Sequence, residues 1–127
     1  MTYVVKYDNI PHMPELVRTI SWLKAARKDF EEFPREVQLD MLTALTVAAR
    51  GGKADIAKPF KGVGSGVFEI ALKHRGDAFR AIYAVQIGDD LWVVDTFQKK
   101  SKSGIKTPQM DVDRIKERIK RLKEALR

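Results

Sequence analysis

The segment that decides the fold is 67-VFEIALKHRGDAFRAIYAVQIGDDLWVVDTFQK-99. It contains three runs in which apolar and polar residues alternate, interrupted at residues 75–77 (RGD) and 88–90 (GDD). Alternation with a period of two is typical of half-buried strands, and short turns rich in glycine and aspartate join antiparallel neighbours. We therefore predict strands over residues 67–74, 78–87 and 91–99, which form an antiparallel meander.

Helical patterns flank this meander on both sides. Four apolar residues recur at helical spacing before it: Trp22, Ala26, Phe30 and Phe33. They predict a helix that begins near residue 14 or 21 and ends before Pro34. A second helix is expected over residues 35–50, because a glycine pair follows its apolar stripe. The connection between the two is so short that they are expected to form an antiparallel hairpin.

A last helix is expected over residues 111–126 and a short strand over residues 2–8, while residues 53–66 are predicted to be a linker. The order of elements is then β-α-α-β-β-β-α. Such an order is typical of the α+β class, with helices on one face of an antiparallel sheet. We therefore expect a single domain spanning residues 1–127.

The composition excludes several kinds of site. The chain has 127 residues, of which 44% are hydrophobic, and no cysteine, so disulfides, thiolate catalysis and cysteine-bound metals are excluded. No apolar run approaches the ~18 residues of a membrane span, and the N-terminal residues lack the apolar centre of a signal peptide. We expect a cytoplasmic protein that needs no cofactor and does not contact a membrane.

The positive charge of the chain is concentrated at its C-terminal end. The formal net charge is +7, and residues 98–127 hold eleven Lys or Arg against four Asp or Glu, whereas residues 1–97 hold thirteen of each. A lysine-rich stretch, 96-TFQKKSKSGIKTP-108, begins at the end of the last predicted strand. A basic end of this kind attracts polyanions by long-range steering, which favours a nucleic acid or an acidic partner over a merely solvated loop.

One face of the predicted sheet is polar. A two-residue turn at positions 76–77 would place Lys73 opposite Arg80, and the apolar alternation would lie beneath the helices with Phe68, Ile70, Leu72, Phe79, Tyr83, Val85 and Ile87. The other face would carry Glu69, Lys73, Arg80, Ile82 and Gln86. This carboxylate and these cations could form a shallow basic site. An ordinary cross-strand charge group explains the same pattern and is the interpretation that the charges alone favour.

Other conspicuous residues predict no site. The two histidines, His12 and His74, are isolated and are expected at the surface, whereas Tyr83 and the two tryptophans are expected to pack in the core. No metal-ligand spacing is present, and Gly62, Gly64 and Gly66 precede a strand rather than opening a helix after one. The sequence therefore gives no sign of a metal or a nucleotide cofactor.

Three stretches together resemble a known family: 58-KPFKGVGSGVFEI-70, 74-HRGDAFRAIYAV-85 and 93-VVDTFQKKSKSGIKTP-108. Their order and spacing resemble those of the RelE/HigB-type toxins of toxin–antitoxin modules, in the phage-protein-related branch of the RelE/ParE superfamily. The third stretch is the most specific. The resemblance implies a RelE-like fold and an endoribonuclease that cleaves messenger RNA on the ribosome without a metal, silenced by a cognate helix-turn-helix antitoxin.

The resemblance also implies roles for individual residues. The RNA's own 2′-hydroxyl attacks the adjacent phosphate, which requires a base, cations on the phosphate and an acid at the leaving oxygen. Arg80 would stabilise the phosphate and Glu69 would be the carboxylate base. Lys99 and Lys100 match the basic end of the last strand, which completes the catalytic set. The RNA would be bound by the remaining lysines, Lys61, Lys73, Lys102 and Lys106.

One departure from the family concerns the acid. Several members place a histidine or tyrosine near the C-terminus, but here neither type follows Tyr83. A lysine, whose pKa is ordinarily ~10.4, would act as the acid only if its neighbours lowered that value. Otherwise catalysis would be weak and would rely on contacts made by the ribosome. Two other interpretations remain: a ParE-like toxin of the same fold that inhibits gyrase without hydrolysis, and a non-catalytic RNA-binding domain.

Overall fold

A computed structural model of the chain describes residues 17–99 and 107–126. The described elements follow the order β1 (Ile20–Trp22), α1 (Lys24–Phe30), α2 (Arg35–Ala49), β2 (Ala57–Pro59), β3 (Val67–His74), β4 (Asp77–Ala84), β5 (Leu91–Lys99) and α3 (Gln109–Ala125). The strand expected over residues 2–8 lies outside the described residues. The predicted α+β class is confirmed.

The strands form one five-stranded sheet in the order β1-β5-β4-β3-β2. The predicted antiparallel meander is present as β3, β4 and β5. The sheet as a whole is mixed, because β1 pairs with β5 in parallel. This parallel edge was not predicted. The stripe that suggested one helix from residue 21 instead spans a strand and a helix, because Trp22 packs on Phe30 from β1, with ring centroids 4.8 Å apart.

The predicted linker contains the other edge strand. β2 pairs with β3 antiparallel and ends at Pro59. Proline is tolerated there because an edge strand leaves one side of its backbone without a ladder partner. The pairing places Lys58 opposite Glu69, so an element missed by sequence reasoning brings a cation to the polar face.

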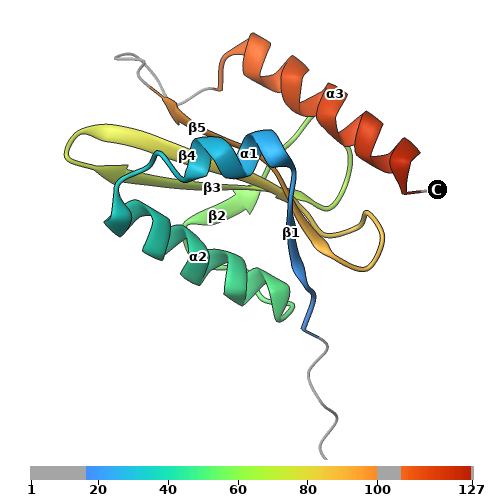
Figure 1. Cartoon of the computed structure of the whole chain (residues 1–127), viewed down its shortest axis with the longest axis horizontal. Helices are drawn as coiled ribbons and strands as arrows, with labels where there is room; N and C mark the ends of the chain where they lie inside the picture. Colours follow the sequence, from blue (N-terminus) through green and yellow to red (C-terminus); the bar gives the residue numbers. More distant parts are fainter. Residues whose placement is uncertain (1–16, 100–106, 127) are drawn as a thin grey trace, which may run out of the picture.

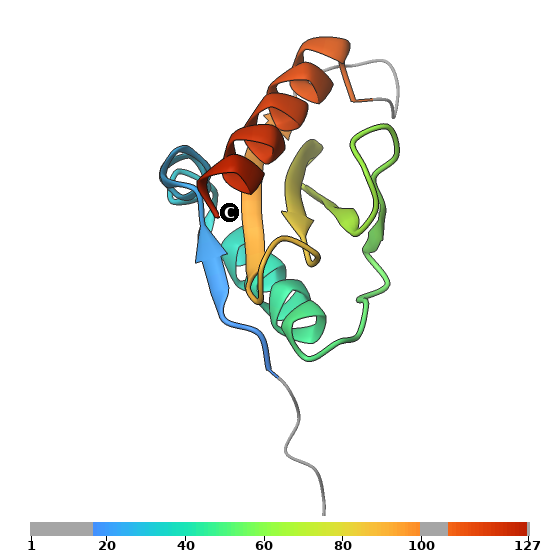
Figure 2. The same cartoon turned by 90° about the vertical axis from the view of Figure 1, so that its right-hand side faces the viewer.

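Helices cover both faces of the sheet, which corrects the prediction of helices on one face. Figure 1 shows α1 and α2 running in opposite directions and α3 on the far side of the strands from α2. Figure 2 shows α3 crossing β5, which lies between α3 and α2. The sheet therefore separates two apolar cores.

The larger core lies beneath α1 and α2. Its central side chains include Met41, Leu45, Ile70 and Tyr83, and Tyr83 stacks on Phe68 with ring centroids 5.3 Å apart. The smaller core lies beneath α3, where Ile115, Ile119 and Leu122 contact the sheet. Ile87, which was expected in the larger core, belongs to the smaller one, as does Ile82, which was expected on the open face.

The turn between β3 and β4 shifts the predicted register by two residues. Arg75 and Gly76 both have positive φ, 52° and 87°, as the tightest two-residue hairpin turn requires. His74 therefore pairs with Asp77, and Lys73 pairs with Ala78 rather than with Arg80. A shift of two leaves each side chain of β3 and β4 on its predicted face, so the same residues form the polar face but pair with different neighbours.

A second irregularity lies in β5. Ile82 pairs with Asp95, but the next residue, Tyr83, pairs with Val93, so Val94 is an extra residue in the strand. Val94 packs in the smaller core beneath α3. No helix within residues 17–99 and 107–126 is long and apolar enough to cross a membrane.

Candidate functional site

The candidate site lies on the α3 side of the sheet, on the part of β3, β4 and β5 nearest the β3–β4 turn. The pairing places Lys73, Ala78 and Lys99 in one row across the three strands. The next row holds Ala71, Arg80 and Phe97. Paired residues share a face, so these side chains lie together. The two alanines add little bulk between the cations.

Glu69 is the carboxylate of this site and is almost fully buried, with 3% of the residue exposed. Its Oε2 accepts a hydrogen bond from Nη1 of Arg80 and another, 3.3 Å long, from the hydroxyl of Thr107. Its Oε1 lies 3.8 Å from Nζ of Lys58. Three elements and the segment before α3 therefore converge on one carboxyl group.

Arg80 and Lys99 are the buried cations of the site, each with 7% of its surface exposed. Burial and the charge of Arg80 lower the pKa of Lys99, and Lys58 acts in the same direction. Glu69 and Asp111 oppose this shift but do not reverse it. Burial thus makes the Lys99 proton easier to release than the proton of an exposed lysine.

Of the other predicted site residues, two are exposed lysines and three lie outside the described residues. Lys73 is exposed on the same face as Arg80, near the turn. Lys61 is exposed and follows β2, directly before Gly62. Lys100, Lys102 and Lys106 lie outside the described residues. In the part of the chain that is described, no three His, Asp or Glu side chains are placed to hold a metal ion together.

The family of this chain follows from its sequence. A family model described as phage-derived proteins resembling Gp49 matches residues 28–120, which is most of the chain and includes every element of the site. The chain belongs to this Gp49-like family. The match confirms the predicted resemblance to RelE-type toxins of the phage-protein-related branch.

The Gp49-like chain also resembles a solved structure. A chain from the crystal structure of the toxin–antitoxin complex RelBE2 of Mycobacterium tuberculosis is 15% identical, with a TM-score of 0.48. The superposition covers 69% of the Gp49-like chain and 98% of the other chain. Comparison with curated proteins found no match.

A buried ionic network in the Gp49-like domain joins α3 to the sheet and was missed by sequence reasoning. Asp95, with 1% of its surface exposed, accepts hydrogen bonds from Nε of Arg114 at 2.9 Å and from Nη1 of Arg118 at 2.8 Å. Arg118 also donates to the main-chain oxygen of Val94 at 3.1 Å, and Arg114 pairs with Asp111 at 2.8 Å. Because Arg114 and Arg118 are four residues apart, they lie on one face of α3.

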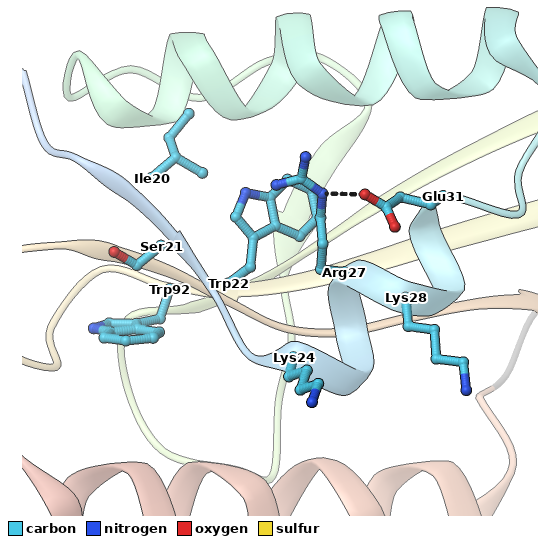
Figure 3. Close-up of a pocket in the computed structure, with 8 residues that line it drawn as sticks. All are labelled: Ile20, Ser21, Trp22, Lys24, Arg27, Lys28, Glu31 and Trp92. Carbon is cyan, nitrogen blue, oxygen red and sulfur yellow. Dashed lines mark hydrogen bonds and ion pairs between the residues drawn. The ribbon is translucent and has the colours of Figure 1, made fainter.

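Two open grooves flank the sheet. The first, of 640 Å³, lies at the β1 edge, and Figure 3 shows Trp22 and Arg27 among its lining side chains. The guanidinium of Arg27 lies 5.2 Å from the centre of the Trp22 ring and pairs with Glu31 at 3.1 Å, so both side chains already have partners. The second groove, of 550 Å³, lies between the loop after β2 and α3.

Proposed function

We propose that this Gp49-like protein is the toxin of a toxin–antitoxin module and cleaves messenger RNA on the ribosome without a metal cofactor. The observation that carries the proposal is the buried pair of Glu69 and Arg80 beside Lys99, whose pKa is lowered. It supplies a carboxylate, a permanent cation and an acid on one face of the sheet. Membership of a RelE-type toxin family supports the same role.

The proposed reaction needs no group beyond these side chains and the RNA. The 2′-oxygen attacks the adjacent phosphorus while its proton passes to the carboxylate of Glu69. The bond from phosphorus to the 5′-oxygen breaks, and that oxygen takes a proton from the ammonium of Lys99. The products are a 2′,3′-cyclic phosphate and a 5′-hydroxyl. Arg80 stabilises the extra negative charge on the phosphate, which develops most strongly in the transition state.

The burial of the pair favours a functional interpretation over an ordinary charge group. Exposed cross-strand pairs cost little to form, but a buried ion pair carries a desolvation penalty and is often no more stable than an apolar substitute. Glu69 and Arg80 are both buried. A pair of this kind is therefore weak evidence for stability and fits a site at which the charges are used.

The test is to induce the protein in cells and to map the ends of cut RNA, then to repeat the cleavage with purified ribosomes and a metal chelator. We expect cuts in translated messages, with cyclic phosphate ends that form in the presence of the chelator. Glu69→Gln is expected to lower the cleavage rate by ~10²–10³, the usual cost of losing one group that acts in the transition state.

The matched control is Glu31→Gln, which removes an exposed carboxylate directly after α1 and leaves the site unchanged. Growth arrest without any cut RNA, together with inhibited DNA supercoiling, would replace the proposal by the gyrase-inhibiting alternative. Binding of RNA without cleavage and without toxicity would leave the non-catalytic RNA-binding alternative. We also propose that a helix-turn-helix antitoxin encoded beside the protein silences it in the cytoplasm.

A further inference from the structure

The groove between the loop after β2 and α3 has one wall made of lysines. Lys116, Lys120 and Lys123 line it from α3. Residues four and three apart lie on the same side of a helix, so the three ammonium groups form a row. With a rise of 1.5 Å per residue, the row is about 10 Å long.

The arginines and lysines of α3 are used differently. All three arginines are in ion pairs: Arg114 and Arg118 with Asp95, and Arg121 with Glu117 at 2.9 Å. Among the described residues, none of the three lysines of the groove is in an ion pair, and all three are exposed. Arg114 and Arg118 therefore join the helix to β5, whereas the lysines present uncompensated charge to the solvent.

The opposite wall is the loop after β2, in which two glycines flank Val63. Gly62 and Gly64 line the groove with φ values of 90° and 105°. A Cβ on Gly62 would meet nothing within 4 Å, and one on Gly64 would meet only Nζ of Lys123, at 4.0 Å. The main chain of this loop can therefore be approached closely by a ligand that lies along the lysine row.

The two acidic residues of the groove do not cancel its charge. Glu117 is paired with Arg121, and the carboxylate of Asp113 accepts a hydrogen bond from Gln109 at 2.9 Å. Asp113 lies nearer the beginning of α3 than the lysines do. The segment from Lys116 to Lys123 therefore carries the net positive charge of this wall.

Both walls continue from elements that carry the candidate site. The loop follows β2, and β2 holds Lys58 beside Glu69. Exposed Lys61 lies between β2 and the glycines of the groove. α3 begins just after Thr107, whose hydroxyl donates to Glu69. From the start of α3 to Lys116 the distance along the helix is about 10 Å, so a strand of nucleic acid at the site reaches the groove within a few nucleotides.

We propose that this groove binds the sugar-phosphate backbone of single-stranded RNA flanking the phosphate held by Arg80. The inference rests on the proposed function and adds to it a second region in which the protein contacts its substrate. The lysine row supplies the charge, and the glycine wall supplies close approach. The lack of base-stacking rings in the lining implies little preference for sequence in this part of the RNA.

The experiment measures binding of two single-stranded RNAs to the full chain, one of about 12 nucleotides and one of about 4. The 2′-hydroxyls are methylated, so that no cleavage occurs. The variant is Lys116→Gln with Lys120→Gln, and the control is Lys24→Gln with Lys28→Gln. Both pairs are exposed lysines four residues apart on a helix, so the two variants lose the same charge.

We expect the groove variant to bind the longer RNA more weakly and to lower the slope of log K against log salt by roughly 1.4, at about 0.7 per lost phosphate contact. The shorter RNA is expected to bind the groove variant and the unmodified chain equally. Circular dichroism checks the fold, and Lys123→Gln alone provides a milder variant with about half the change in slope.

An equal loss in the control variant, or no loss in the groove variant, would overturn the inference. So would a polyglutamate peptide that binds in a groove-dependent manner while the RNA does not, because the groove would then fit an acidic protein segment. If the unmodified chain binds and cleaves RNA but the groove variant shows no defect, only this inference fails. If the unmodified chain neither binds nor cleaves RNA, the proposed function fails as well.

Discussion

Arg80 on β4 contacts Glu69 on β3 diagonally rather than directly across the pair of strands. Arg80 pairs with Ala71, and Glu69 pairs with Ile82, so the ion pair spans one step of the sheet. The diagonal is open because Ala71 is small. It directs the guanidinium towards the carboxylate on the α3 face, where Lys58 and Thr107 also contact Glu69.

The first prediction separates the stabilising and the functional contributions of this pair. Arg80→Met leaves the buried carboxylate without its main cation, so we expect the free energy of unfolding to fall by about 3 kcal/mol. Glu69→Gln combined with Arg80→Met removes both charges, and we expect most of that loss to be recovered. Activity is expected to be lost in both variants. Denaturant unfolding and RNA cleavage are the two measurements.

The matched control for the pair lies at the C-terminal end of α1. Arg27 and Glu31 are the same two residue types, four apart, with more than half of each side chain exposed. Arg27→Met with Glu31→Gln is expected to change stability by less than about 0.5 kcal/mol and to leave cleavage intact. A doubly substituted site that remains as unstable as Arg80→Met would contradict the prediction, and so would one that cleaves RNA.

The second prediction concerns Lys99 and pH. Since the folded state lowers the pKa of Lys99, this residue contributes stability above its unfolded pKa of ~10.4, and that stability is lost as the pH falls through the folded pKa. Lys99→Met removes this dependence. We expect the Tm difference, variant minus unmodified, to be more positive at about pH 7 than at about pH 10. Lys73→Met is the control, and an equal pH trend there would refute the assignment to Lys99.

The lowered pKa of Lys99 also predicts how the rate of RNA cleavage falls at alkaline pH. If its ammonium is the acid, the rate falls as the pH rises through the lowered pKa, and Lys99→Met abolishes both the rate and this limb. Cleavage rates across the alkaline range measure the effect. An unchanged alkaline limb in Lys99→Met would assign the acid to another group.

The third prediction concerns Asp95 and the position of α3. Asp95→Asn leaves Arg114 and Arg118 without their shared carboxylate, so we expect a loss of about 3 kcal/mol in stability and faster hydrogen exchange in α3. Asp113→Asn, which changes an exposed aspartate of the same helix, is the control. Equal exchange rates in α3 for both variants would contradict a role of Asp95 in holding this helix.

The pH dependence of the same variant has a definite sign. Burial raises the pKa of Asp95, although hydrogen bonding and charge from Arg114 and the charge of Arg118 oppose this. A raised folded pKa means that the stability from Asp95 is fully present below its unfolded pKa of ~3.9 and is lost as the pH rises through the folded pKa. The Tm advantage of the unmodified chain over Asp95→Asn is therefore expected to be larger at about pH 4 than at about pH 7. A smaller advantage in acid would mean that the arginines outweigh burial.

The fourth prediction concerns the antitoxin. We expect the contacting segment of the partner to be acidic and to cover part of the basic C-terminal end, because electrostatic complementarity speeds association and blocks RNA at the same time. Hydrogen exchange of the chain with and without its neighbour-encoded partner measures this. Protection in α3 is the expected result, whereas protection confined to residues 22–50 would mean that the partner acts by bulk alone.

Much of the sheet could be predicted from the sequence because alternation and turns are local signals. The bounds of β3 and β5 are confirmed to the residue. The register between β3 and β4 could not be predicted, because the turn places Arg75 at a positive φ, where asparagine, aspartate or glycine is usual. β1 and β2 have three residues each, too few for a period to be visible, and they form only because longer strands offer them an edge.

The site was predicted in part for the same reason. Alternation places Glu69 and Arg80 on one face, and their ion pair agrees with that prediction. Lys58 was missed as a site residue because β2 was missed, and Thr107 because it comes from the segment before α3. The partners of Asp95 were also missed, since Arg114 and Arg118 read as part of a solvated basic face when α3 is taken alone.

The extra residue in β5 changes which side of the sheet the later side chains of this strand face. Leu91 and Val93 lie beneath α1 and α2, and counting onwards by twos would put Lys99 there too. Val94 and Asp95 both face α3, so the alternation of side chains shifts by one residue at this point. Lys99 therefore lies on the same face as Arg80. It follows that β5 tolerates a change of length at one place. Removal of Val94 closes the bulge and leaves every later side chain on its face, whereas removal of Thr96 turns Asp95 into the larger core.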